Sequence, residues 1–136
     1  LPALKDLVGR LGLDKSVSFH GVVPHEQVAA YMSAADLVFV PYSFLELNYG
    51  TAVFEAFACG RAVCGFRRVR SAPVDRVGGF LVDPEEESGA KELEVRVRDT
   101  AYLERKGAEG SELAQTHLAA NVARRLELAF ESVLRR

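Results

Sequence analysis

The sequence predicts an α/β fold in which a parallel β-sheet is flanked by helices. Segments with apolar residues at helical spacing alternate along the chain with short apolar runs, and one of these runs, Leu37–Val40, is unbroken. Strands that alternate with helices are typical of layered folds with a parallel sheet. The chain has 136 residues, of which 49% are hydrophobic and 26% are charged. This length and composition suit one globular domain over residues 1–136.

The first part of the chain is predicted to contain two helices and two strands. Apolar residues recur at helical spacing in residues 4–13 and 25–35, and Pro24 stands just before the second segment, where its missing N–H does no harm. Residues 16–20 alternate between polar and apolar side chains, which predicts a half-buried strand. The unbroken run Leu37–Val40 predicts a strand that is buried on both faces, as in a parallel sheet.

The middle of the chain continues the same alternation. A third helix is predicted over residues 50–58, and strands are predicted over residues 62–66 and 79–82. The connection between these two strands, residues 67–73, carries several arginines and ends in a proline.

Periodicity in the tail is less uniform. Residues 92–98 alternate perfectly between polar and apolar side chains, which by period alone favours a strand. Gly107 and Gly110 are expected to interrupt the next segment. From Val122 to the end, apolar residues at helical spacing predict an amphipathic helix.

Charge and cysteine usage limit the classes of function. The formal net charge of −2 offers no electrostatic footprint for nucleic acid, so we expect no nucleic-acid partner. No apolar run is long enough to span a bilayer, and no signal peptide is visible. Two cysteines, Cys59 and Cys64, form neither a disulfide framework nor a zinc motif, which fits a reducing, cytoplasmic location. Because the chain starts at Leu1 rather than at a methionine, we expect it to be a fragment.

The loop after Leu37–Val40 is the predicted ligand site. In open parallel sheets, ligands bind beyond the carboxyl ends of the strands. Gly50 allows the backbone to approach a ligand closely, and Thr51 stands where a helix N-terminus would offer its free amides to a phosphate. About one turn further on, the carboxylate of Glu55 could accept hydrogen bonds from vicinal sugar hydroxyls, and Glu46 in the loop could do the same for a second sugar.

Taken singly, each of these signals also has a purely structural interpretation. A glutamate in a helix is usually a surface residue, and a glycine before a helix usually belongs to a turn. Glu55 differs because Phe54, Ala56 and Phe57 surround it, so it does not readily sit on a fully solvated face. Burying a carboxylate costs free energy unless a partner compensates. Glu55 is therefore the best candidate for a ligand contact.

Several segments in the same order resemble the family 4 (group 1) glycosyltransferases. The segment VSFHGVV at residues 17–23 is similar to a strand of that family, and AADL at residues 34–37 is similar to the start of the next strand. GTAVFEAFACG at residues 50–60 resembles the family's glutamate-containing core, and GFLVDP at residues 79–84 resembles a later strand and turn. The resemblance covers most of the chain and implies the Rossmann-like C-terminal domain of a GT-B enzyme, in which residues 93–97 are helical despite their alternation.

The resemblance also implies a function and a set of site residues. It implies a donor-binding domain of a retaining glycosyltransferase, which moves a sugar from a nucleotide sugar to an acceptor whose identity is open. Glu55 takes the place of the glutamate that binds the donor ribose, and Glu46 is the candidate catalytic glutamate that contacts the donor sugar. Asn48, Tyr49, Gly50 and Thr51 approach the donor phosphates. The family implies no metal and no cofactor, the nucleotide sugar being a substrate, and peripheral membrane association of the full protein is compatible with it.

Three departures from the family pattern leave a second interpretation open. Eight residues separate Glu46 from Glu55, one more than in the family, and Leu47 stands at the family's glutamate position. Residues 67–73, whose arginines could bind phosphate, an acidic acceptor or only solvent, replace a glycine pair and a glutamate. The third departure is that the family's opening strands and their phosphate-neutralising Arg and Lys have no counterpart here.

These departures lead to three expectations. The isolated chain should have no transferase activity, because a diphosphate without cationic partners would bind weakly. The alternative function is a non-catalytic, glycosyltransferase-like module that binds a protein partner through the arginine loop and the terminal amphipathic helix. Self-association through an exposed strand edge is also expected, because such an edge invites pairing with another chain.

Overall fold

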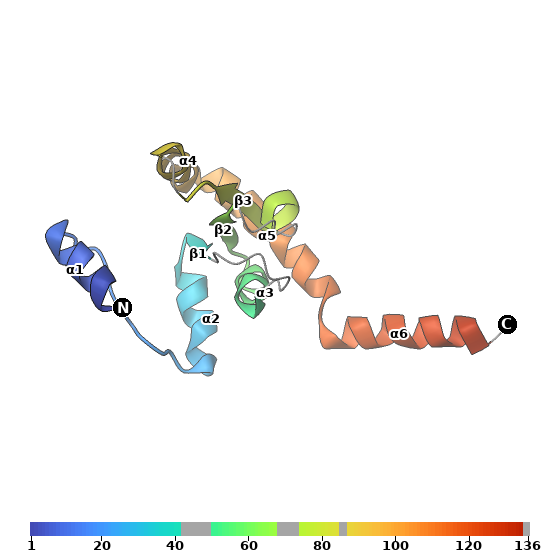
Figure 1. The fold of residues 1–136 in the computed structure, drawn as a ribbon. Helices are drawn as coiled ribbons and strands as arrows, with labels where there is room; N and C mark the ends of the chain where they lie inside the picture. The colour runs from blue at the N-terminus through green and yellow to red at the C-terminus, as the bar shows by residue number, and fades with distance from the viewer. Residues whose placement is uncertain (42–49, 68–73, 85–86, 135–136) are drawn as a thin grey trace.

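The computed structural model describes residues 1–41, 50–67, 74–84 and 87–134, with side chains described as far as residue 130 (Figure 1). Helices and strands alternate through most of the chain, as predicted. The elements are α1 Pro2–Arg10, α2 His25–Ala34, β1 Leu37–Val40, α3 Thr51–Ala58, β2 Ala62–Phe66, the π-helical turn η1 Val74–Gly78, β3 Gly79–Val82, α4 Glu87–Arg98, α5 Thr100–Thr116 and α6 Ala119–Leu134.

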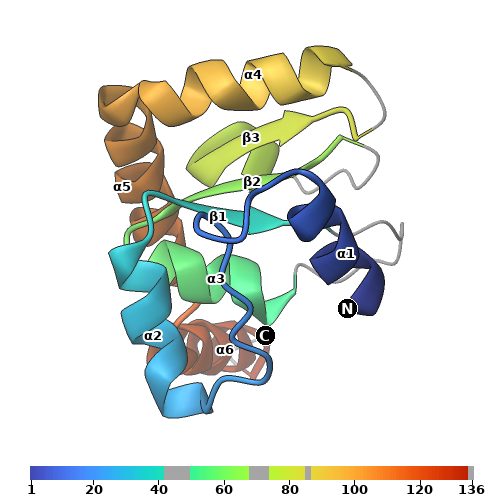
Figure 2. The same ribbon diagram turned by 90° about the vertical axis from the view of Figure 1, so that its left-hand side faces the viewer.

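The three strands form one parallel sheet in the order β1-β2-β3. In the register of this sheet, Val40 lies opposite Gly65, and Phe66 lies opposite Val82. The carboxyl ends of all three strands therefore meet at one edge. Figure 2 shows the strands running toward this edge, on the side where α3 begins. The predicted α/β class with a parallel sheet is confirmed, and the bounds of all three strands match the prediction.

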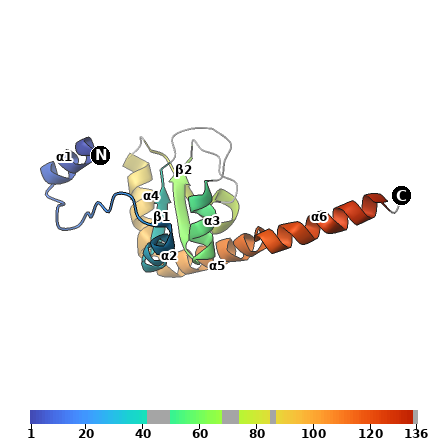
Figure 3. The ribbon, with the colours of Figure 1, turned by 90° about the horizontal axis from the view of Figure 1, so that it is seen from below.

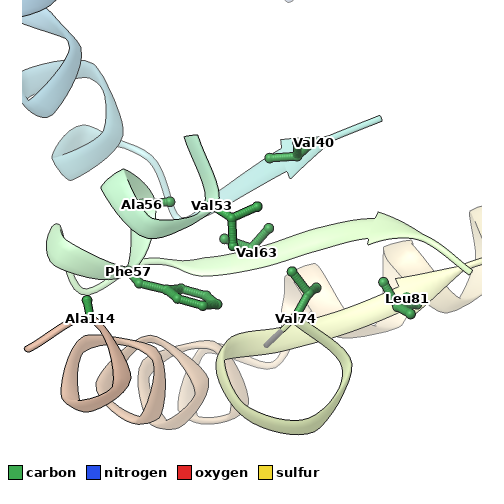
Figure 4. Packing of buried hydrophobic residues seen from close by; sticks show 8 residues of the cluster. All are labelled: Val40, Val53, Ala56, Phe57, Val63, Val74, Leu81 and Ala114. Carbon is green, nitrogen blue, oxygen red and sulfur yellow. The ribbon is translucent and has the colours of Figure 1, made fainter. Parts of the chain in front are cut away.

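Helices cover both faces of the sheet (Figure 3). On one face, Phe57 and Val53 of α3 pack against Val63 of β2 and against Val74 of η1 (Figure 4). On the other face, Leu93 of α4 and side chains of α5 pack against β2 and β3; the buried members of this second cluster are Ala62, Cys64, Phe80, Val82 and Leu103. The core is thus a three-layer arrangement in which β2 is the central strand, and β2 and β3 are both largely buried.

The two terminal helices lie largely outside this core. Figures 1 and 3 show α1 and α6 extending away from the sheet toward opposite ends of the molecule. α6 exposes apolar side chains at helical spacing, including Val122, Leu126 and Phe130, so its predicted amphipathic character is confirmed. No helix in the described ranges combines the length and the apolar character that crossing a membrane requires.

The predicted strand over residues 16–20 is wrong. These residues are irregular, Val17 is only half-buried, and Phe19 is 37% exposed. Their alternating pattern can form a strand only beside a partner, and among the described residues β1 has no neighbour on its outer side. Without hydrogen bonds to a partner strand, the alternating pattern alone does not produce a strand.

The predicted burial of β1 on both faces is also wrong. Val38 and Val40 face the first core cluster, whereas Phe39 on the opposite face is 43% exposed and contacts the ring of Phe66 edge-on, at 5.3 Å between ring centroids. On this face, α4 and α5 cover β2 and β3, and of β1 only Leu37 packs against their cluster. An unbroken apolar run therefore indicates a strand of a parallel sheet, but it does not show whether helices pack on both of its faces.

Residues 92–98 belong to helix α4, so the strand period is misleading and the family resemblance is correct. Only Leu93 of the alternating apolar residues packs into the core, while Val95 and Val97 are exposed. Ion pairs at i,i+4, such as Lys91–Glu87 at 2.8 Å and Arg98–Glu94 at 2.8 Å, join successive turns of this helix. These pairs require helical geometry and contribute to its local stability.

The expected interruption at Gly107 and Gly110 does not occur, because α5 runs through both glycines. Both are buried where α5 crosses α3 and the start of β2. A Cβ atom at Gly107 would overlap the carbonyl oxygen of Gly60, and one at Gly110 would lie 2.6 Å from Cδ1 of Phe57. These glycines allow a close helix approach, which offsets their low helix propensity.

Candidate functional site

The candidate site lies at the carboxyl edge of the sheet, where helix α3 begins. The chain leaves β1 at Val40 and enters α3 at Thr51. α3 then runs back along one face of the sheet, with Val53, Ala56 and Phe57 buried against it. The helix N-terminus is thereby held at the edge where ligands bind in parallel sheets.

The N-terminus of α3 has no side-chain cap. Gly50 is the N-cap residue, and its carbonyl accepts a hydrogen bond from the Val53 N–H at 2.9 Å. The amides of Thr51 and Ala52, at the first two helical positions, precede the first donor of the helical ladder. Free amides and the positive end of the helix dipole suit an anion such as a phosphate.

Glu55 lies one turn after Thr51 on the same helix. Residues four apart share a helix face, so the two side chains leave α3 on one side. Thr51 is exposed and Glu55 is half-buried, whereas the other face of α3 packs into the core. Within the described part of the chain, no hydrogen bond or ion pair engages the Glu55 carboxylate. A half-buried carboxylate of this kind is available to hydroxyl donors of a ligand.

The other predicted site residues have no described positions. Glu46, Asn48 and Tyr49 lie in residues 42–49, outside the described ranges. The separation between the two predicted glutamates is therefore not described, and the roles assigned to Glu46 and Glu55 stay predictions.

Arg67, the first residue after β2, occupies the same edge, and its guanidinium is held by other residues of the chain. Its Nε donates to Oδ2 of Asp83 at 3.1 Å, and one terminal nitrogen donates to the carbonyl of Leu81 at 2.8 Å. The same nitrogen lies 3.4 Å from Oε2 of Glu92 on α4. One interpretation of residues 67–73 is that their arginines contact only solvent. Arg67 does not fit this interpretation, because protein groups bind its guanidinium. Its partners follow it by 16 and 25 residues, so no local pattern could have indicated them.

A groove of about 530 Å³ opens at the opposite, amino-terminal edge of the sheet. It lies between the starts of β1 and β2 and helix α5, and it combines charged, hydroxyl and apolar side chains, among them Asp36, Arg61, Glu104, Thr100 and Leu103. The candidate site residues do not line this groove. The described ranges contain no group of three or more His, Cys, Asp or Glu side chains arranged to hold a metal ion.

Comparison with known proteins identifies the family. A family model described as "Glycosyl transferases group 1" matches residues 1–99. This chain belongs to the group 1 glycosyltransferases. The match includes α3 with Glu55 and β3 with the Asp83 turn, so it covers the candidate site and the whole sheet.

Individual relatives agree with this assignment. The chain is 36% identical over 117 residues to a D-inositol 3-phosphate glycosyltransferase of Streptomyces griseus subsp. griseus, a match that covers 83% of this chain and 24% of the relative. The chain therefore spans about a quarter of the length of this relative.

Solved structures show the same fold. A sucrose-phosphate synthase from Thermosynechococcus elongatus matches with a TM-score of 0.74 and 26% identity, over 95% of this chain and 34% of that one. The C-terminal domain of a group 1 glycosyl transferase (LpcC) from Francisella tularensis matches with a TM-score of 0.69 and 24% identity, over 85% of this chain and 60% of that one. The fold is therefore that of the Rossmann-like C-terminal domain of GT-B glycosyltransferases.

Proposed function

We propose that this chain is the donor-binding part of a retaining glycosyltransferase and that it binds a nucleotide sugar at the carboxyl edge of its sheet. The observation that carries the proposal is the placement of Glu55 on the open face of α3, one turn from an uncapped N-terminus. A helix N-terminus binds phosphate, and a nearby carboxylate binds vicinal hydroxyls, so the pair matches a nucleotide diphosphate and its ribose. Family membership supports this assignment.

In the proposed complex, the donor diphosphate lies against the amides of Thr51 and Ala52. Glu55 accepts hydrogen bonds from the ribose hydroxyls, and Gly50 leaves room for the backbone to approach the phosphates. Glu46, Asn48 and Tyr49 complete the donor contacts, with Glu46 toward the transferred sugar. The protein needs no resident metal or cofactor in this scheme, and residues 1–136 form one partial domain of a cytoplasmic enzyme of carbohydrate biosynthesis.

Replacing Glu55 by glutamine tests the donor site in the natural protein that contains this chain. Loss of hydrogen bonds to a charged group should weaken donor affinity by about 10- to 100-fold. The measurement is isothermal titration with UDP, GDP and ADP and with their sugar conjugates. Glu112→Gln is the matched control, because Glu112 is an exposed glutamate on α5. Equal donor affinity in Glu55→Gln and the unaltered protein would refute the assignment.

We also propose that the isolated 136-residue chain is inactive as a transferase. The family resemblance implies a phosphate-neutralising Arg and Lys that have no counterpart in these 136 residues, and a leaving diphosphate needs electrostatic stabilisation. Incubation of the chain with a panel of nucleotide sugars, followed by measurement of released nucleoside diphosphate, should show no turnover above background. Turnover in the range of ordinary enzymes would contradict this.

A second candidate function rests on the exposed apolar side chains of α6. Leu126 is 53% exposed and Phe130 is 66% exposed, and contiguous exposed apolar surface marks interaction sites. In this alternative the chain is a non-catalytic, glycosyltransferase-like module that binds a protein partner. The Glu55→Gln titration separates the two candidates, because such a module has no donor affinity to lose.

A further inference from the structure

Arg67 is a cation placed between two carboxylates that come from different elements. Its guanidinium joins the carboxyl end of β2 to Asp83 after β3 and to Glu92 on α4, at 3.1 and 3.4 Å. The backbone of Arg67 also connects the ends of these two strands, because its N–H donates a hydrogen bond to the carbonyl of Val82 at 2.9 Å. Half of the Arg67 side chain and 40% of the Asp83 side chain are exposed. Ion pairs this exposed contribute little to stability, so stability alone does not explain the arrangement.

The position of Arg67 relates it to the proposed donor site. In the sheet register, Val40 and Gly65 lie side by side, so Arg67 follows two residues beyond the level at which β1 ends. Neighbouring strands are roughly 5 Å apart. The Arg67 cluster, defined here as Arg67, Asp83 and Glu92, therefore lies at the same edge as the start of α3, where the proposed function places a diphosphate.

The positive and negative side-chain charges of the Arg67 cluster and its neighbour Arg96 balance one another. Arg96 lies 4.0 Å from Glu92, so Glu92 has two cationic neighbours. Asp83 has only Arg67 as an ion-pair partner within the described ranges. Two arginines thus face two carboxylates. Among the described residues, removal of Arg67 would leave one uncompensated negative charge, centred on Asp83, at the same sheet edge as the proposed site for an anionic ligand.

We propose that Arg67 is a positioning residue for the donor: it neutralises Asp83 and Glu92 and ties the carboxyl ends of β2 and β3 together, so that this edge of the sheet accepts a nucleoside diphosphate. The inference rests on the proposed function of the same edge. It assigns Arg67 no direct contact with the ligand, since its Nε and one terminal nitrogen are engaged by the protein.

The test compares three variants of the natural protein that contains this chain, titrated with UDP, GDP and ADP. At low ionic strength, Arg67→Ala should weaken binding of the tightest of these ligands by about two- to fivefold, through repulsion from Asp83. The difference should shrink as salt is raised to about 0.5 M, because salt screens exposed charges. The double variant Arg67→Ala with Asp83→Asn should recover most of the affinity.

Arg98→Ala is the matched control. Arg98 is another exposed arginine, and its loss also frees a carboxylate, that of Glu94 at 2.8 Å, but it stands at the last residue of α4. Affinity should therefore be unchanged in Arg98→Ala. Circular dichroism at the titration temperature verifies that each variant is folded.

Each outcome separates this inference from the proposed function. Unchanged affinity in Arg67→Ala, with affinity lost in Glu55→Gln, overturns the role of Arg67 and leaves the donor site standing. A loss in Arg67→Ala that neither salt nor Asp83→Asn reduces overturns the charge-balancing role, because it indicates a packing effect. If the unaltered protein binds none of the three ligands, both the proposed function and this inference fail.

Discussion

Replacing Gly107 by alanine should destabilise the chain, although helix propensity alone predicts the opposite. Gly107 is buried in the middle of α5, where alanine would ordinarily stabilise a helix by about 1 kcal/mol. Here the added Cβ would overlap the Gly60 carbonyl oxygen and lie 2.9 Å from its carbonyl carbon. It would also lie 3.3 Å from the backbone nitrogen of Ala62. Two of these atoms belong to the turn between α3 and β2, and the third belongs to the first residue of β2. All three are backbone atoms, so α5 itself must move.

The expected size follows from these contacts. Overpacking a well-packed core costs roughly 1–3 kcal/mol, and backbone atoms cannot rotate away as the end of a side chain can. We therefore take the upper end of this range, about 3 kcal/mol, and subtract the propensity gain of about 1 kcal/mol. The expected net loss in the free energy of unfolding is about 2 kcal/mol. Urea denaturation followed by circular dichroism measures this loss as a lower midpoint with an unchanged slope.

Ala108→Gly supplies the propensity reference on the same helix. Ala108 is the next residue and is exposed, so its replacement should cost about 1 kcal/mol from propensity alone. If Gly107→Ala raised the free energy of unfolding by about as much as Ala108→Gly lowered it, α5 would not contact the Gly60 backbone. The account of the close approach of α5 to the turn between α3 and β2 would then be refuted.

Three further predictions concern the core, its titration and the sheet edge. Phe57→Ala should lower the free energy of unfolding by about 3–5 kcal/mol in the same urea assay, because Phe57 is fully buried between α3, α5 and the sheet; a loss below 1 kcal/mol would contradict that packing. Burial, with a smaller contribution from the charge of Glu92, raises the pKa of Cys64 from 9.0 to about 12. The unfolded thiol ionises above about pH 9 while the folded thiol keeps its proton, so stability should fall by about 1.4 kcal/mol per pH unit between those values, and Cys64→Ala should lack this part of the slope; identical slopes would contradict it. Phe39→Lys should reduce self-association of the chain measured by light scattering, because Phe39 is exposed on the edge strand β1 and lysine on an edge opposes strand pairing; a clean monomer at all concentrations before substitution would remove the basis for this prediction.

The predicted part of the candidate site depends on local signals. Gly50, Thr51 and Glu55 could be singled out because they sit together in one apolar helix that follows a buried strand, and the helix is where the sequence predicts it. The Arg67 cluster could not be identified in the same way. Its members come from β2, the turn after β3 and α4, and their proximity depends on the parallel pairing of β2 with β3 and on the packing of α4.

Sequence alone determined the α/β class, the bounds of the three paired strands and the family. The class and the strand bounds follow from local periodicity, and the family follows from short motifs. Tertiary structure decided the state of residues 16–20, of residues 92–98 and of the glycines in α5. An alternating segment becomes a strand only if a neighbour supplies ladder hydrogen bonds, and β1 offers residues 16–20 no such pairing. A glycine can remain inside a helix where another backbone segment packs too closely for a side chain. At Gly107 the backbone of Gly60 occupies the space that a side chain would need, and α5 continues through this position. Such contacts join residues far apart in the chain, so no window of sequence contains them.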